Sequence, residues 1–432
     1  MIRKILFLAG LSALLPLTVL SAQPRVWTLE ECIRYAYDNN ISLQMDRNTY
    51  LSGLEDTEQA RASLFPTLSA NVSQSVSASP WSEGSHGVYS GSYGLNSSVT
   101  LFDGGKLRNT YKSRQIQNAM DSLTVEAGKL DLCESIVQAY MQCLYAAESV
   151  RANESTAEAS KAQRDRAAQL QKAGAISKVD YAQLESQYVS ALYQVTAANN
   201  ALENYQLQLK QLLELDILDE MALAGYEADS TEVMRLIPDK ATVYANALDF
   251  LPELQRSRRS TEIAELSEKS AKAGFLPSVS LSAGLGTNNN SISSAGLGSQ
   301  LQDNFSGNAG IGISIPILSG RQNRTAVNKA RIALDNSRLE EKSVEKAILR
   351  QVESTYLDAV SAQSQYVAAL EKQKYAEISY DLTREQFNVG RKNTVELITA
   401  QNELTSAVQA TLQAKYMALL NQKLLDIYQG NI

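Results

Sequence analysis

The stretch ARASLFPTLS at residues 60–69 has a counterpart, AKAGFLPSVS, at residues 271–280. The prolines at the centre of the two segments, Pro66 and Pro277, are 211 positions apart, and the residues that precede them align at the same offset without gaps. Self-similarity over such a length indicates that one supersecondary unit occurs twice. We therefore read the chain as a duplication and each copy as a set of helices and strands in the same order.

Further along the chain the offset becomes 216, as in Gly104 with Gly320 and Gly174 with Gly390. The change predicts a net insertion of five residues in the second copy. It falls between the counterparts of Ser69 and Gly104, where a loop would tolerate it. The predicted divisions are a signal peptide at 1–22, a first repeat at 23–213, a linker at 214–238 and a second repeat at 239–432.

The first residues have the pattern of a secretory signal. Arg3 and Lys4 precede an apolar run at residues 5–20, and the small residues Ser21 and Ala22 follow it. This order is typical of a cleaved signal peptide, with cleavage expected near Ala22. An uncleaved membrane anchor is the alternative, but the run is short for a membrane span.

Each copy is predicted to run helix, strand, strand, long helix, turn, long helix. The first helix opens with a capping box at Thr28 and Glu31, continues to Leu64 and stops at Pro66. The strands then alternate apolar with small polar residues, as period two requires of a sheet with one wet face. The alternating apolar positions are Leu68, Ala70, Val72 and Val76, then Tyr89, Tyr93, Leu95, Val99 and Leu101, then Val279, Leu281, Ala283 and Leu285, then Phe305, Ala309, Ile311, Ile313, Ile315 and Ile317.

Strands of about 10 residues are long enough to cross a bilayer within a barrel. The aromatic residues Trp81, Tyr89 and Phe305 near the loop ends resemble an aromatic girdle. A soluble β-sandwich remains the alternative for the strands alone. The loops WSEGSHG after Pro80 and TNNNSISSAGLGSQ after Gly286 are expected to be mobile tips.

Two long arms follow the strands, at residues 106–172 and 322–388. Proline is absent from both, so each can form roughly 100 Å of helix at about 1.5 Å per residue. Each arm ends at a lone glycine, Gly174 or Gly390, where a second helix is expected to return. Apolar residues recur on the last return helix at Val408, Leu412, Tyr416 and Leu420. A soluble antiparallel coiled coil would show the same pattern.

Several function classes lack support in the composition. The net charge is −7 without a Lys/Arg block, which argues against nucleic-acid binding. Histidine occurs once, at His86, so we expect neither a histidine-dependent metal site nor a Ser-His triad. Cys32, Cys133 and Cys143 have no C-x-x-C spacing, and we expect Cys133 and Cys143 to pack as small apolar residues rather than to act as a redox pair. We expect no cofactor, no metal and no enzyme activity.

Four strands cannot close a transmembrane barrel, and an open strand edge cannot face lipid. Three chains would supply twelve strands, and their helical hairpins would continue the wall as a cylinder. With a signal peptide and arms of roughly 100 Å, the predicted object reaches from an outer membrane across the periplasm. The fold class is mostly α: long antiparallel hairpins plus four strands that contribute to a trimeric barrel.

The chain resembles the TolC family of outer-membrane factors over nearly all of its mature length. The resemblance rests on WTLEECI (27–33), LFP (64–66), LFDGG (101–105), ILSG (317–320), KAGAISKVD (172–180) and FNVGRKNTVE (387–396). It implies a homotrimeric exit duct in a Gram-negative outer membrane, with its helices in the periplasm. It also implies partnership with a periplasmic adaptor and an inner-membrane pump in efflux or type I secretion.

The resemblance also implies roles for residues at the two helical turns. Gly174, Ala175, Gly390 and Arg391 would contact the adaptor.

The gate of the periplasmic entrance would involve Asp180, Phe387, Lys392, Glu396 and Thr399. Lys392 replaces the arginine of the family pattern and keeps its charge without bidentate geometry. Phe387 replaces a tyrosine, Glu396 an aspartate and Thr399 a second aspartate, so a tight gate and a double acidic ring are not implied.

Simpler roles account for some of these residues. Asp180 and Glu396 lie in the first turn of a helix, where the helix dipole favours acids. Gly174 and Gly390 fit as helix C-caps. The other function class left open is an exported structural or adhesin coiled coil, although a filament would not need the alternating strands.

Overall fold

The computed structural model describes residues 26–78, 87–219, 221–224 and 230–431. The predicted signal peptide, Trp81 and His86 lie outside these ranges. In chain order the elements are β1 (Val26–Trp27), α1 (Leu29–Asn39), α2 (Ile41–Ala62), β2 (Thr67–Ser77), β3 (Val88–Phe102), α3 (Lys106–Lys172), α4 (Lys178–Leu212), β4 (Ala222–Leu223), α5 (Ser230–Val233), α6 (Lys240–Phe250), α7 (Pro252–Ala273), β5 (Ser278–Asn290), α8 (Leu297–Asp303), β6 (Ser306–Ser314), α9 (Gln322–Asn388) and α10 (Thr394–Tyr428).

The helices of the two halves match in length. α1 and α6 have 11 residues each, α2 and α7 have 22, α3 and α9 have 67, and α4 and α10 have 35. Their first residues keep the sequence offsets: Ile41 and Pro252 are 211 positions apart, and Lys106 and Gln322 are 216 apart. Both long arms have the bounds that the sequence predicted.

The predicted first helix, 28–64, is in fact two helices. The Thr28–Glu31 capping box is present. Asn40 then interrupts the helix with an extended backbone (φ −62°, ψ 127°), and its side-chain oxygen accepts a hydrogen bond from the Leu43 N–H at 3.1 Å. Asn40 thus ends α1 and caps α2. The prediction of one continuous helix was wrong because an asparagine can cap as well as occupy a helix.

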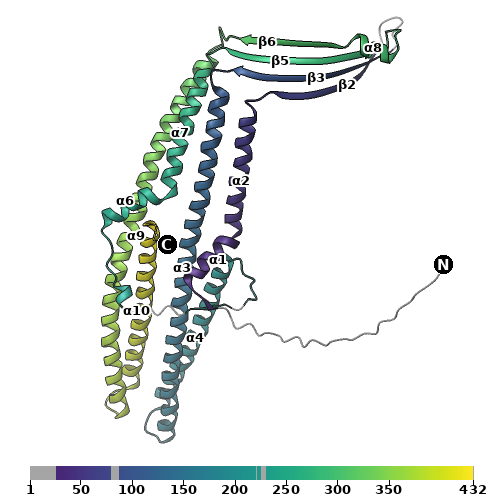
Figure 1. The fold of residues 1–432 in the computed structure, drawn as a ribbon. Coiled ribbons are helices and arrows are strands. Elements are labelled where there is room, and N and C mark those ends of the chain that lie inside the picture. Colours follow the sequence, from purple (N-terminus) through teal and green to yellow (C-terminus); the bar gives the residue numbers. More distant parts are fainter. Residues whose placement is uncertain (1–25, 79–86, 220, 225–229, 432) are drawn as a thin grey trace, which may run out of the picture.

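The four long strands form one antiparallel sheet in the order β2-β3-β5-β6. β2 and β6 are therefore its two edges. Cross-strand register places Ala70 opposite Leu95, and Leu95 opposite Leu285. The predicted apolar positions of neighbouring strands thus lie on one face of the sheet. In Figure 1 the sheet extends away from one end of the helices.

The second hairpin tip is more ordered than predicted. β5 continues to Asn290, and α8 occupies part of the segment that was expected to be a mobile loop. Gln300 fastens this tip: its side-chain oxygen accepts from the Asn290 N–H at 2.9 Å and its amide donates to the Ala295 carbonyl at 2.7 Å. β6 is shorter than predicted, since Phe305, Ile315 and Ile317 lie outside it.

The long helices pack in two tiers (Figure 1). Nearer the sheet, α2 and α7 pack against α3, and α7 also packs against α9. Farther from the sheet, α3 and α9 end at two hairpin tips, and α4 and α10 begin there and return alongside them. A row of small buried residues runs along α10 at Ala407, Thr411, Ala414 and Ala418. This buried row lies one residue away from the apolar positions that the sequence predicted to face the core. Of those, Val408, Leu412 and Leu420 are only half-buried. The contact is made by small residues because they let the helices approach closely.

The main core lies where the two tiers meet. Tyr140 of α3 is 1% exposed, and its hydroxyl lies 3.2 Å from the Trp27 carbonyl and 3.1 Å from that of Ala224. Trp27 is in β1 and Ala224 directly follows β4, and the short parallel pair β1–β4 joins the start of the described chain to the segment between the repeats. Cys32, Cys133 and Cys143 are buried and form no disulfide with one another. Cys133 and Cys143 thus pack in the core as the sequence predicted. Burial raises the pKa of the Cys143 thiol to about 12.

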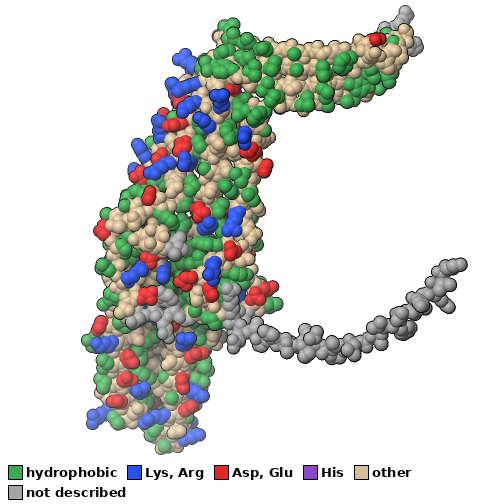
Figure 2. Space-filling model, viewed as in Figure 1, with side chains coloured by type: hydrophobic (Ala, Val, Ile, Leu, Met, Phe, Trp, Pro, Cys, Tyr) green, Lys and Arg blue, Asp and Glu red, His purple; other side chains and the backbone are tan. Residues whose placement is uncertain are grey.

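Charge separates the sheet from the helices. The residues of β2, β3, β5 and β6 include no Asp, Glu, Lys or Arg, whereas both signs cover the helices (Figure 2). Among the described helices, none has an apolar run of the length and purity that a membrane-spanning helix needs.

Candidate entrance at the hairpin tips

Both hairpin tips turn through a glycine in the left-handed region, with φ of +76° at Gly174 and +74° at Gly390. At the first tip, the N–H of Ala175 donates to the Leu170 carbonyl at 2.8 Å. At the second, the N–H of Arg391 donates to the Gln386 carbonyl at 2.8 Å. These bonds satisfy the last carbonyls of α3 and α9, as a Schellman motif does. The prediction that the glycines act as caps is confirmed.

Asp180 belongs to a capping box at the start of α4. Its N–H donates to the Ser177 hydroxyl oxygen at 3.0 Å, and its carboxylate accepts from the Ser177 N–H at 3.3 Å. The Ser177 hydroxyl, followed by Thr394, holds the pKa of Asp180 below its ordinary value. Asp180 therefore caps its own helix, and its pKa also responds to Thr394, the first residue of α10.

Glu396 has the equivalent place at the start of α10. Its N–H donates to the Asn393 side chain at 2.9 Å, and its carboxylate accepts from the Asn393 N–H at 3.0 Å. Lys392 forms an ion pair with the same carboxylate. Lys392, followed by the Asn393 N–H, lowers the pKa of Glu396. The predicted gate residues Lys392 and Glu396 thus pair with each other within one tip.

A small apolar core lies behind the tips and is separate from the main core. It consists of Ala167, Leu184, Tyr380, Leu397 and Ala400, with Ile176, Tyr181, Phe387, Ile398 and Leu404 packed against it. Phe387 is half-buried there, so its ring supports the turn instead of making a hydroxyl contact. Thr399 is exposed and lines a shallow groove between α4 and α10, together with Val179 and Val395.

Polar bonds between the two hairpins of the chain complete the arrangement. The Gln163 amide donates to the Tyr380 hydroxyl at 2.7 Å, and the Gln401 amide donates to the Ser160 hydroxyl at 2.6 Å. Sequence reasoning missed these residues and Thr394, because their roles depend on pairs about 200 positions apart. It could have found the caps: Ser177 and Asn393 each stand three residues before an acid, and they are 216 positions apart.

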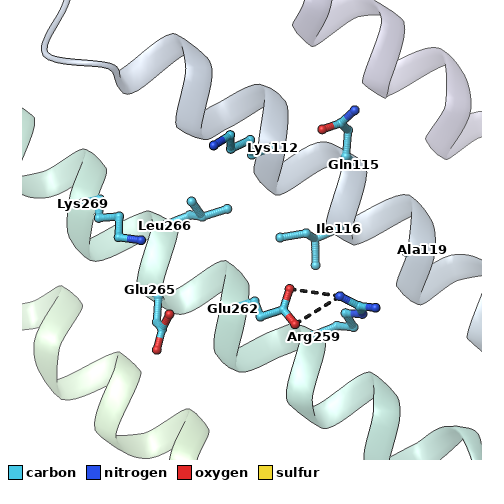
Figure 3. Close-up of a pocket in the computed structure, with 9 residues that line it drawn as sticks. All are labelled: Lys112, Gln115, Ile116, Ala119, Arg259, Glu262, Glu265, Leu266 and Lys269. Carbon is cyan, nitrogen blue, oxygen red and sulfur yellow. Dashed lines mark hydrogen bonds and ion pairs between the residues drawn. The ribbon is translucent and has the colours of Figure 1, made fainter.

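A second groove lies nearer the sheet, between α3 and α7 (Figure 3). Lys112 and Lys269 line it, together with the apolar side chains of Ile116 and Leu266. Arg259 and Glu262 in the same groove form an ion pair at 3.1 Å. In the described residues, no group of three or more His, Cys, Asp or Glu side chains is arranged to hold a metal ion.

Charge-free strands at one end of a long helical body, with paired hairpin tips at the other, define a channel subunit of the outer-membrane type. The family model for "Outer membrane efflux protein" matches residues 33–214 and 243–430. The chain therefore belongs to the outer membrane efflux protein family.

Known outer-membrane proteins are similar in sequence to this chain along nearly its whole length. It is 22% identical over 411 residues to the outer membrane efflux protein BepC of Brucella suis biovar 1 (strain 1330), with 95% of this chain and 87% of that protein covered. It is 24% identical over 423 residues to the outer membrane protein TolC of Escherichia coli (strain K12), with 94% and 83% covered.

Solved channel structures share the fold. The CusC structure superposes with a TM-score of 0.81 at 18% identity and covers 93% of this chain and 91% of its own. The CmeC outer membrane channel of Campylobacter jejuni gives a TM-score of 0.80 at 19% identity, with 94% and 86% covered.

The protein is an outer-membrane channel of the efflux and secretion class, from a Gram-negative bacterium, with its helices in the periplasm. The adhesin alternative is not supported.

Proposed function

We propose that three copies of this chain form one passive duct, with a twelve-stranded β-barrel in the outer membrane and a cylinder of helices below it. The observation that carries the proposal is the sheet, whose two faces differ in chemistry, one mostly apolar and the other mostly polar, and whose two edges are open. A sheet in lipid must satisfy every backbone group, and closure with other copies is the way to do so.

The two faces follow from the strand register. On one face, Leu95 has Ala70 and Leu285 as neighbours, and Leu281 has Val99 and Ile311. On the other face, apart from Val88 opposite Ser77 at the loop end, the aligned residues are serine, threonine, asparagine or glycine, including Thr67, Ser69, Asn71, Ser73, Ser75, Ser90, Ser92, Gly94, Asn96, Ser98, Thr100, Ser280, Ser282, Gly284, Gly286, Asn308, Gly310 and Gly312. We assign the first face to lipid and the second to a water-filled lumen.

The apolar face also contains the polar residues Gln74, Ser97, Thr287 and Asn289, and the polar atoms of Gln74 are paired. Gln74 lies there among Val72, Val76 and the tyrosines of β3. Its amide nitrogen donates to the Tyr93 hydroxyl at 2.7 Å, and its oxygen accepts from the Tyr89 hydroxyl. This trio lies toward the outer end of the sheet, where amphipathic tyrosines suit the membrane boundary.

The helices also leave apolar surface for a neighbouring copy. α9 exposes a series of large apolar side chains: Leu339, Leu357, Val360, Val367, Leu370, Ile378 and Leu382. α2 and α4 expose another: Ile41, Met45, Leu51, Val189, Leu192 and Tyr193. Exposed apolar surface of this extent marks a contact with another molecule. We assign it to contacts between copies around the cylinder.

The matched helix lengths support a division into the signal peptide 1–22, repeats 23–213 and 239–432, and the linker 214–238. In this scheme each repeat supplies two strands and one long hairpin. The twelve strands of a trimer are thus six copies of one hairpin unit.

We assign the periplasmic entrance to the tips, with Asp180, Phe387, Lys392, Glu396 and Thr399 at the gate. Gly174, Ala175, Gly390 and Arg391 would meet a periplasmic adaptor that bridges to an inner-membrane pump. The names of relatives support a role in export. One of them is the toxin and drug export protein A of Aggregatibacter actinomycetemcomitans, to which the chain is 24% identical over 403 residues. The pump would supply the energy, so this chain needs no catalytic step.

Fractionation tests the proposal. The mature protein should require detergent for extraction from outer membranes and should migrate as a heat-sensitive trimer. Recovery as a monomer in the soluble periplasmic fraction would contradict it.

A further inference from the structure

Positive charge is concentrated at the beginning of the two long arms. Residues 106–114 and 321–331 contain eight Lys and Arg side chains and no Asp or Glu, although the whole chain has a net charge of −7. These residues are Lys106, Arg108, Lys112, Arg114, Arg321, Arg324, Lys329 and Arg331. All eight are exposed.

Two of the eight have acidic partners on neighbouring helices. Arg114 pairs with Asp56 of α2 at 3.5 Å, and Arg331 pairs with Glu268 of α7 at 3.0 Å. The other six form no ion pair with the described residues. We call these six the basic rim: Lys106, Arg108, Lys112, Arg321, Arg324 and Lys329.

The basic rim directly adjoins the strands without charge. α3 begins at Lys106, four residues after β3 ends at Phe102. Figure 2 shows Lys and Arg side chains gathered on the part of the helices that meets the sheet, and none on the visible face of the sheet. If the sheet spans the membrane, the rim lies at the level of the lipid headgroups on the periplasmic side.

The groove in Figure 3 extends the rim onto α7. Lys112 lines one side of it and Lys269 the other. The groove also contains acids, but arginines engage them: Glu262 pairs with Arg259 and Glu265 with Arg338, the latter at 3.4 Å. The two lysines therefore remain available for an external anion.

We propose that the basic rim binds the phosphate groups of anionic phospholipids in the periplasmic leaflet. Long basic side chains near an apolar span reach naturally to headgroup phosphates. The cations are spread over both repeats of the chain, with Arg108 and Arg324 at equivalent positions 216 residues apart. A dispersed, repeated set suits a fluid layer of headgroups rather than one small ion. The inference rests on the proposed membrane-spanning sheet.

The test uses the purified full-length mature protein in detergent. Mixed micelles would contain either phosphatidylglycerol or phosphatidylcholine with the same acyl chains, and native mass spectrometry would count the lipids retained. Wild-type protein should retain phosphatidylglycerol at least fivefold better than phosphatidylcholine. High salt should abolish that preference, because it screens exposed charges.

The rim variant combines Arg108→Gln, Lys112→Gln, Arg324→Gln and Lys329→Gln. Its charge-matched control combines Lys161→Gln, Lys172→Gln, Lys346→Gln and Lys372→Gln, which are lysines outside the rim. The rim variant should lose the preference and the control should keep it. Equal retention of the two lipids by wild type, or a preference that persists in the rim variant or at high salt, would overturn the proposal.

The measurements on wild-type protein test the proposal even if the rim variant fails to fold. Insertion into vesicles of pure phosphatidylcholine separates this inference from the proposed function. If wild-type protein inserts but shows no lipid preference, only the lipid-binding role of the basic rim is refuted. If wild-type protein remains soluble without detergent, the proposed channel function is refuted.

Discussion

The sheet and the hairpin tips are opposite ends of the same molecule and differ in how complete they are. The tips are complete within one chain: both turns are capped, both acids belong to capping boxes, and one apolar core lies behind both turns. The sheet does not. β2 and β6 have one neighbouring strand each, and apolar side chains such as Leu68 (74% exposed) and Ile311 (66% exposed) have no cover.

The difference follows from where each element makes its hydrogen bonds. A helix closes its bonds within itself and leaves only its ends to be capped. A strand closes them with neighbours, so a sheet of four always leaves two edges. One chain can therefore satisfy the backbone hydrogen bonds of its hairpin tips, but it cannot satisfy those at the edges of its sheet.

The largest effect should come from charge on the apolar face of the sheet. Leu95→Arg places a cation among Ala70 and Leu285. An arginine facing lipid near the bilayer centre costs about 2–4 kcal/mol, and each trimer would contain three. We expect loss of the heat-sensitive trimer on gels of outer-membrane extracts. Asn96→Arg, one residue along and on the polar face, should assemble normally. Equal loss in both variants would break the assignment of the faces.

Gly174→Val tests the completeness of a tip. A Cβ at Gly174 would meet nothing within 4 Å, so the penalty comes from its φ of +76°. A left-handed residue other than glycine costs roughly 1–2 kcal/mol. We expect a lower melting temperature with the trimer still formed. Gly174→Asn should restore most of the loss, because asparagine tolerates this conformation. No difference between Val and Asn would show that the turn is not constrained.

Glu134 gives the helical body a pH dependence of its own. Burial, and then the nearby charge of Asp131, raises the pKa of Glu134 to about 7. A carboxyl whose pKa is higher in the folded than in the unfolded state stabilises most below its unfolded value of about 4.5 and loses that contribution as pH rises toward 7. Glu134→Gln should flatten the melting temperature between pH 5 and about 8. If the melting temperature of the variant depends on pH as that of wild type does, another group is responsible for the pH dependence.

The smallest effect on stability should come from the tip charges. Lys392→Ala removes an exposed ion pair within one helix turn, and Asp180→Ala removes one half of a capping box. We expect little change in melting temperature, but higher single-channel conductance in planar bilayers because contacts at the entrance are lost. Glu126→Ala, an exposed acid far from the tips, serves as the control. Unchanged conductance in both tip variants would reject their role in the gate and leave the channel intact.

Much of the fold was readable in the sequence because its signals are local. The absence of proline and the two lone glycines gave both arms their bounds, and alternation gave the strands. The predictions that failed concern residues that are compatible with two local structures. Asn40 could have continued a helix but caps one, and Gln300 orders a tip whose composition suggests a loop.

The candidate entrance was less predictable, for the same reason. The glycine caps are local and were found. The partners of Asp180, Lys392 and Phe387 are set by how two distant hairpins pack, which no short window of sequence records. Lys392 pairs with Glu396 of its own helix, and Phe387 belongs to an apolar core.

The central claim is that β2 of one copy pairs with β6 of the next. Cysteines on these edges test it directly, for instance Val72→Cys with Ile311→Cys and neighbouring positions to sample the register. Within one chain the two edges are three strand spacings apart, roughly 14 Å, too far for a disulfide. The native cysteines are buried and should not compete. Oxidation in outer membranes should give covalent dimers and trimers and nothing larger. Monomers alone, or a ladder that continues past three, would contradict a closed ring of three chains.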